Sequence, residues 1–197
     1  MTSQNDKIAG TLLTVGGIQF VLALIIAEAI YPGYIIADNY ISDLGVWGKP
    51  SAAIFNPSVI IFGITIIAAS VFIKRDFHLG KLAYLYSIAG AGTLGVGIFP
   101  ENTFIISGIS VLHSISALLA FVVGALSAIV TYKITKTPFR YISAFLGAFS
   151  LVALVVFLAT RDTSALGIGA GGLERMVAYP TTLGLIGFGG YLLGSQD

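Results

Sequence analysis

Six apolar runs dominate this sequence, each close to the roughly 20 residues that a helix needs to cross the hydrocarbon core of a bilayer. They lie near residues 8–31, 52–73, 82–99, 106–132, 141–160 and 174–194. The runs are continuous rather than alternating, which favours helices over the strands of an outer-membrane barrel. With 56% hydrophobic and 10% charged residues, the chain could not cover a globular surface with polar groups. We predict an all-α integral membrane protein, a six-helix transmembrane bundle forming one domain over residues 1–197.

The basic residues gather on one side of these runs and predict the orientation. Seven of them share that side: Lys7, Lys74, Arg75, Lys81, Lys133, Lys136 and Arg140. Only Lys49, Arg161 and Arg175 belong to the other side. Cytoplasmic loops are enriched in Lys and Arg. We therefore expect a multi-pass protein of the cell membrane with both termini in the cytoplasm and with the loops 32–51, 100–105 and 161–173 facing outward.

Acidic residues follow the opposite distribution. Six belong to the expected outer half: Glu28, Asp38, Asp43, Glu101, Asp162 and Glu174. His113 is the only histidine within a run, at an expected depth of roughly 10 Å along its helix. Asn56 lies near the outer end of the run 52–73, on the same side of the membrane as His113. The polar stretch DNYISDLGVW, residues 38–47, therefore forms one wall of a predicted polar cluster at the outer membrane boundary.

These polar residues have structural as well as functional interpretations. Aspartate commonly caps helices and turns, which is the structural interpretation of Asp38, Asp43 and Asp162. Ser42 with Asp43 could cap a short interfacial helix. Glu28, His113 and Glu174 lie within or at the edge of lipid, where ionisable groups are costly and tend to find partners or functions. Either glutamate could pair with Arg175, or the group could serve a ligand, a proton or a substrate.

Several classes of function are disfavoured. A net charge of +1 without a clustered basic face offers no nucleic-acid surface, and the absence of cysteine excludes disulfides and thiol chemistry. Gly167 to Gly172 reads GIGAGG and matches a dinucleotide-binding pattern, but no strand–helix–strand unit surrounds it. No metal-ligand spacing is present. We expect neither a cofactor nor a metal.

Small residues predict close helix packing. Glycines 90, 92, 95 and 97 lie in one run and glycines 184, 187, 190 and 194 in another, at spacings that allow backbones to approach. A stripe at three- and four-residue spacing is expected to face the bundle interior. It consists of His113, Ser116, Ala117, Ala120, Gly124 and Ser127.

A series of short motifs resembles a known family. They are YISDLG at 40–45, FNP at 55–57, GIFPEN at 97–102, LHSISALLAF at 112–121 and GGLERM at 171–176. In order and spacing they resemble six-span archaeal and bacterial membrane proteins grouped as domain of unknown function 998. The resemblance implies a six-helix bundle and supplies no activity. It also singles out candidate ligand-binding positions, namely Ser42, Asp43, Asn56, Glu101, His113, Glu174 and Arg175.

Three functions fit these features. The first is a polar pocket at the outer boundary that binds a membrane lipid headgroup, or another membrane subunit or a second copy of the chain. The second is a membrane-embedded hydrolase or transferase for a lipid or isoprenoid, in which His113 or Glu101 acts as general base, Asp43 orients it and Arg175 holds an anion. The third is a small transporter, although the inner halves of the runs carry few polar groups.

Overall fold

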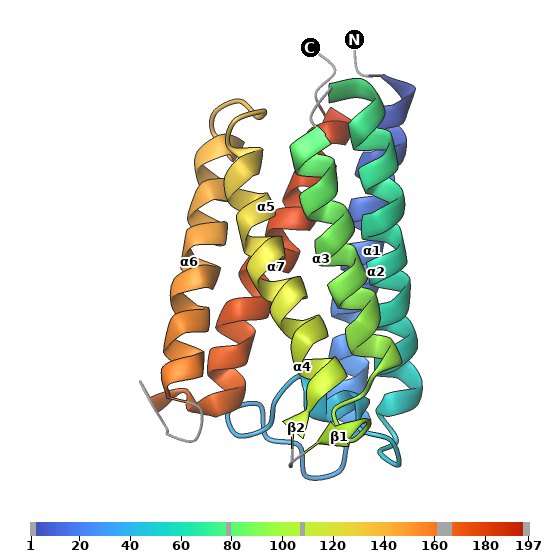
Figure 1. Ribbon diagram of the computed structural model, residues 1–197, viewed down its shortest axis with the longest axis vertical. Helices are drawn as coiled ribbons and strands as arrows, with labels where there is room; N and C mark the ends of the chain where they lie inside the picture. The colour runs from blue at the N-terminus through green and yellow to red at the C-terminus, as the bar shows by residue number, and fades with distance from the viewer. Residues whose placement is uncertain (1–2, 78–79, 107–108, 161–166, 195–197) are drawn as a thin grey trace.

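The computed structural model describes residues 3–77, 80–106, 109–160 and 167–194 (Figure 1). Arg161 and Asp162, which the sequence places with the outer polar residues, lie outside these ranges. Five uninterrupted long helices are α1 (Gln4–Ile30), α2 (Ala52–Phe77), α3 (Gly80–Ile98), α6 (Phe139–Ala159) and α7 (Gly169–Gly194). A sixth long segment joins α4 (Val111–Leu118), a π-helical turn η2 (Leu119–Val123) and α5 (Gly124–Thr131). The prediction of an all-α bundle is confirmed.

Five of the long helical segments are apolar and long enough to cross a membrane. They are Gln4–Ile30, Ala52–Lys74, Val111–Thr131, Phe139–Ala159 and Gly169–Gly194. The sixth segment, α3, lies in the same bundle, but over its described residues its mean hydropathy is too low for it to count among these spans, because Lys81, two tyrosines and several glycines fall within its 19 residues. The structure thus supports five of the six expected spans by length and composition.

The helices close into a ring around a shared interior. Helix α1 packs against α2 and α7, α2 against α3, and α3 against α4 and η2, while α5 packs against α6 and α6 against α7. Figure 1 shows α7 crossing obliquely behind α5, from beside α6 towards α1. The start of α1 and the end of α7 lie together at one end, here called the termini end. The segments 31–51 and 99–106 lie at the other, the loop end.

Glycine sets the close packing of α2 on α3. A side chain at Gly63 would come within 2.5 Å of the Leu94 backbone nitrogen and 2.7 Å of the Gly90 carbonyl oxygen. Only glycine leaves the two backbones free to approach so closely. The small-residue spacing in α3 therefore has the packing role that the sequence predicts.

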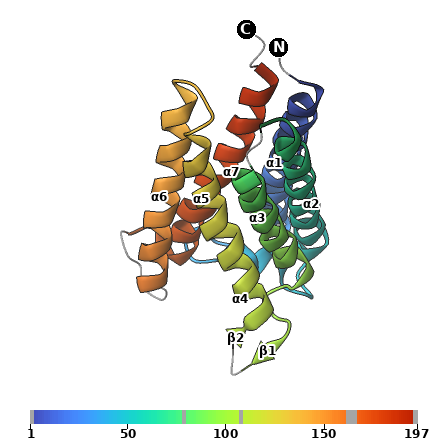
Figure 2. The same ribbon diagram turned by 45° about the horizontal axis from the view of Figure 1, so that its top comes forward.

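The loop end departs from the predicted element bounds. The fourth helix was expected to begin at residue 106. Instead, β1 (Ile105–Ile106) pairs antiparallel with β2 (Ile109–Ser110), and α4 begins only at Val111. Figure 2 shows this pair projecting beyond α4. An apolar run alone does not separate a short strand from the start of a helix.

Candidate functional site

Arg175 connects α7 to the 31–51 loop by side-chain hydrogen bonds. Its Nη2 donates to Glu28 Oε1 at 2.7 Å and to the Tyr34 hydroxyl at 2.6 Å. Its Nη1 lies 3.0, 3.1 and 2.8 Å from the carbonyl oxygens of Ile36, Asn39 and Gly171. The side chain is 4% exposed. Both terminal nitrogens are thus occupied by the protein itself, which leaves them poorly placed to hold an anionic ligand.

The glycines before and within the first turn of α7 make room for the same loop. Gly171 donates its backbone N–H to the Ala37 carbonyl at 2.9 Å, and a side chain there would come within 2.0 Å of the Asn39 carbonyl oxygen. Gly169 has a φ of +72°. The GIGAGG sequence therefore serves loop packing, and α7 begins at 169 rather than at the predicted 174.

Tyr34 completes this anchor. Its hydroxyl accepts from Arg175 and donates to the Tyr40 carbonyl at 2.8 Å. Burial raises the pKa of Tyr34 to about 12, because a phenolate would lose its hydration there, although the hydrogen bond from Arg175 opposes this shift. The phenol is therefore neutral at any physiological pH and keeps its donor.

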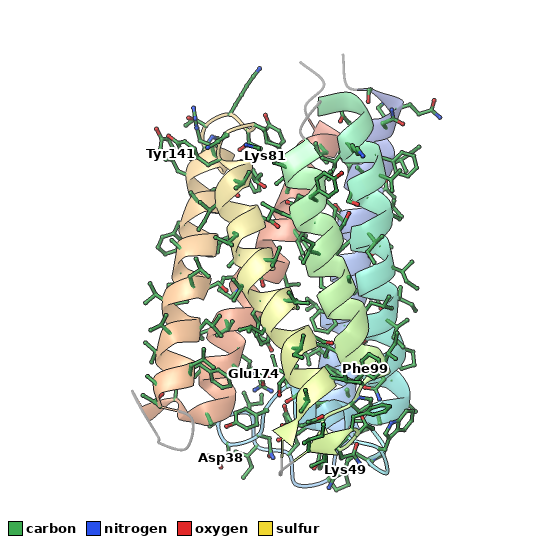
Figure 3. All side chains as sticks on the ribbon, in the orientation of Figure 1. Asp38, Lys49, Lys81, Phe99, Tyr141 and Glu174 are labelled. Carbon is green, nitrogen blue, oxygen red and sulfur yellow. The ribbon has the colours of Figure 1, made fainter. Side chains whose placement is uncertain are left out.

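Ser42, Glu101 and Glu174 meet at the base of the loop. Ser42 begins the short 3₁₀ helix η1 (Ser42–Gly45), and its hydroxyl donates to Glu101 Oε2 at 2.9 Å. Glu174, on the first turns of α7 and 6% exposed, accepts a hydrogen bond from the backbone N–H of Ile41. Figure 3 shows Glu174 at the loop end, far from Lys81 and Tyr141. Glu101 thus contacts the Ser42 side chain, and Glu174 contacts the backbone of the neighbouring Ile41.

Asp43 and Asn56 have local structural partners. Asp43 Oδ2 accepts from the Tyr40 N–H at 2.9 Å and from Asn39 Nδ2 at 3.2 Å, so it holds the turn before η1 and does not cap the helix itself. Asn56 Nδ2 donates to the Gly45 carbonyl at 2.9 Å and so joins α2 to η1. Neither lines a cavity described below.

His113 lies in the first turn of α4, closer to the helix end than the sequence suggested, because α4 begins at Val111. Its Nδ1 is 2.9 Å from the Phe99 carbonyl oxygen. A carbonyl can only accept, so Nδ1 carries the proton and, in the neutral ring, Nε2 is the acceptor. The ring is oriented by a backbone carbonyl, not by Asp43.

Two cavities meet at these polar residues. The lateral cavity, about 420 Å³, lies between the loop end of α4, α6 and the 31–51 loop, and Glu101, Leu154 and Phe157 are among its lining residues. The inner cavity, about 90 Å³, runs between α2, α4–α5 and α7. Five residues line both: Ser42, His113, Ala117, Phe121 and Glu174. The two spaces therefore share one polar junction.

The lateral cavity opens towards the side of the bundle. Its lining includes Ile115, Leu118 and Leu158, which are 52%, 48% and 44% exposed on the outer face. Helices α5 and α6 pack together, whereas α4 and α6 separate towards the loop end in both views (Figures 1 and 2). In a membrane such an opening faces lipid rather than water.

The seven sequence candidates thus divide into two groups. Ser42, Glu101, His113 and Glu174 line the lateral cavity, whereas Asp43, Asn56 and Arg175 hold the surrounding backbone. From the predicted small-residue stripe, Ala117, Ala120 and Gly124 line the inner cavity. The sequence does not single out the aromatic lining residues, such as Phe121 and Phe157. The chain contains 13 phenylalanines, and no sequence pattern separates those that line a cavity from the others. Within the described ranges, no three His, Asp or Glu residues form a group suited to a metal ion.

The fold defines a class, the multi-pass helical membrane proteins, with a polar junction near one end of the spans. The chain belongs to the family described as protein of unknown function (DUF998), whose model matches residues 14–190, so the resemblance of the short motifs is confirmed. Neither the curated proteins nor the solved structures include one that matches this chain.

Proposed function

We propose that this protein binds an amphipathic membrane molecule, with its polar head in the lateral cavity and its apolar part in the inner cavity. The observation that carries the proposal is the shared junction of Ser42, His113 and Glu174, polar residues at the point where a laterally open space meets an apolar inner one. In the expected orientation the head would lie at the outer boundary of the cell membrane.

The charges of the lateral cavity favour a particular kind of head. Glu101 and Glu174 supply carboxyl oxygens as acceptors, and none of the described residues lining this cavity is Lys or Arg. The guanidinium of Arg175 is already hydrogen-bonded to Glu28 and to the 31–51 loop. A bare phosphate would therefore meet carboxyl groups and no cation, whereas hydroxyl or ammonium groups would find acceptor oxygens.

Native mass spectrometry of the detergent-purified protein tests this proposal. Glu101→Gln with Glu174→Gln keeps the side-chain size but removes both carboxyl groups, and Asp38→Asn is the matched control at an exposed carboxylate outside both cavities. Lipid-mass adducts should persist in wild type and in the control and be lost from the double variant. Equal adducts in all three, or none, would contradict the proposal. A co-purifying protein lost only from the double variant would favour a partner subunit as the occupant.

The second candidate is a membrane-embedded hydrolase or transferase acting on a lipid or isoprenoid. The orientation of His113 favours it, because Nδ1 bound to the Phe99 carbonyl leaves Nε2 as a base at the junction beside Glu174. His113→Asn tests the role, since the asparagine amide can replace the Nδ1 donor but not the Nε2 acceptor. Lipid extract reconstituted with wild type should yield a product that the variant does not form. An unchanged extract would leave binding as the function.

A transporter gains less support. The inner cavity ends among Ile66, Ala89 and Leu185, so the described lining offers no ionisable group towards the termini end. Polar groups continuing through the midplane are the usual sign of a transport path.

A further inference from the structure

We infer that the inner cavity accepts one apolar chain at a time, about as long as one leaflet is thick, and that Gly124 at its deep end limits the chain length. This inference rests on the proposed function, because it assigns the apolar part of the same ligand. It names the ligand class as an amphiphile that inserts a single unbranched or narrow chain.

The length follows from the helices that line the cavity. Its lining extends from Phe55 to Ile66 on α2, from His113 to Gly124 on α4–α5, and from Glu174 to Leu185 on α7. Each interval is 11 residues, which at about 1.5 Å per residue corresponds to about 16 Å. Half of a typical hydrocarbon core is about 15 Å. A chain whose head lies at the junction would therefore end near the bilayer midplane.

The width allows only one chain. The free volume between these helices is small, about 90 Å³, and the rings of Phe20, Phe62 and Phe121 flank it. A second chain beside the first would require these side chains to leave a close-packed interior. A two-chain lipid would have to leave its other chain in the bilayer, through the lateral opening.

The lining beyond the junction is apolar in effect. Thr93, Thr181 and Thr182 are its hydroxyl residues, and each hydroxyl donates to a carbonyl of its own helix, at 2.9, 2.8 and 3.0 Å. These bonds satisfy the hydroxyl donors locally and leave the rest of the lining hydrocarbon. A polar ligand segment would be desolvated there without a partner.

Gly124 provides the means to change the depth. A β-carbon built at Gly124 meets nothing nearer than the Thr181 carbons at 3.9 Å, so a side chain there has open space. A leucine at this position would fill the deep end without forcing helices apart. Gly190 on α7 has no atom within 4 Å of its β-carbon position and lies exposed outside both cavities, which makes Gly190→Leu the matched control.

The experiment uses saturated monoacylglycerols of increasing chain length, whose hydroxyl heads suit the acceptor oxygens of Glu101 and Glu174. The protein is purified in digitonin, whose rigid steroid body is too wide for the inner cavity. Affinity, read from the shift in thermal unfolding midpoint, should rise with each added methylene and level off once the chain fills about 16 Å of cavity. Each methylene accommodated should raise affinity about fourfold.

Gly124→Leu should level off at a shorter chain and bind the longest favoured chain at least about tenfold more weakly than wild type, while Gly190→Leu follows wild type. Leu185→Ala should shift the limit the other way. If both cavity variants keep the wild-type length profile, the inference fails although binding itself stands. If no monoacylglycerol stabilises wild type, the proposed head-and-tail binding fails with it.

Discussion

At the scale of single residues, neighbours in sequence have separate roles. Glu174 and Arg175 are adjacent, and successive helical residues are rotated by about 100° around the axis. Glu174 therefore lines both cavities, while Arg175 reaches the 31–51 loop and Glu28. The sequence left open which glutamate pairs with Arg175, and the rotation explains why it is Glu28. Sequence alone could not show this, because the partner lies 147 positions away.

Arg175→Gln should strongly destabilise the fold. The change leaves Glu28 without its ion-pair partner and removes the contacts that hold the Ile36 and Asn39 carbonyls. Removing one member of a buried pair typically costs about 3–5 kcal/mol. Thermal unfolding in detergent measures the loss, with Lys49→Gln as the control, because Lys49 is exposed and its ammonium lies over the ring of Tyr31. Equal midpoints for the two variants would contradict the anchoring role.

Tyr34 gives the fold a pH dependence in the alkaline range. Burial raises its pKa from 10.0 to about 12, so between these values the folded protein keeps a proton that the unfolded chain releases. The free energy of unfolding should therefore fall as pH rises from about 10 to about 12. Tyr34→Phe removes this contribution. Its unfolding midpoint should decline less steeply than that of wild type across the window, whatever its absolute stability, and identical slopes would rule out the contribution.

At the scale of elements, the segment from α4 to α5 shapes the site in a way that sequence did not reveal. Its π-helical turn, Leu119–Val123, contains Phe121, the aromatic residue that lines both cavities. A π-turn inserts one residue into the helical repeat and redirects the side chains around it, often at functional sites. Apolar runs predict that a helix exists, but not such a change of register within it.

Phe121→Ala should speed ligand exchange. The phenylalanine lies between the lateral and inner cavities, so its removal widens the passage while leaving the polar junction and the deep end in place. Dissociation of a bound monoacylglycerol, followed by displacement with a labelled copy, should become several-fold faster with the same chain-length limit. Leu119→Ala is the control, since Leu119 belongs to the same turn, is 39% exposed and lines neither cavity. Equal exchange in both variants would exclude Phe121 as the barrier.

At the scale of the whole molecule, local sequence patterns predicted where the helices lie better than they predicted how the helices pack against one another. Length, apolar content and charge distribution gave the six long segments and the grouping of acidic residues at one end. They could not give the closure of α1 against α7, or the separation of α4 from α6 that creates the lateral opening, because both depend on packing between distant segments. The site follows from these contacts, and so only its polar residues were accessible from sequence.

The orientation of the whole bundle determines which leaflet supplies the ligand. Lys7, Lys81, Lys133 and Lys136 all belong to the termini end, and the positive-inside rule therefore predicts that the loop end faces outward. The natural chain has no cysteine, so labelling of a single introduced thiol shows on which side of the membrane that one position lies. Asp38→Cys should react with a membrane-impermeant maleimide in intact cells, whereas Lys133→Cys should react only after permeabilisation, both residues being exposed. The reverse pattern would place the polar junction at the cytoplasmic boundary, so that lipid would enter between α4 and α6 from the inner leaflet.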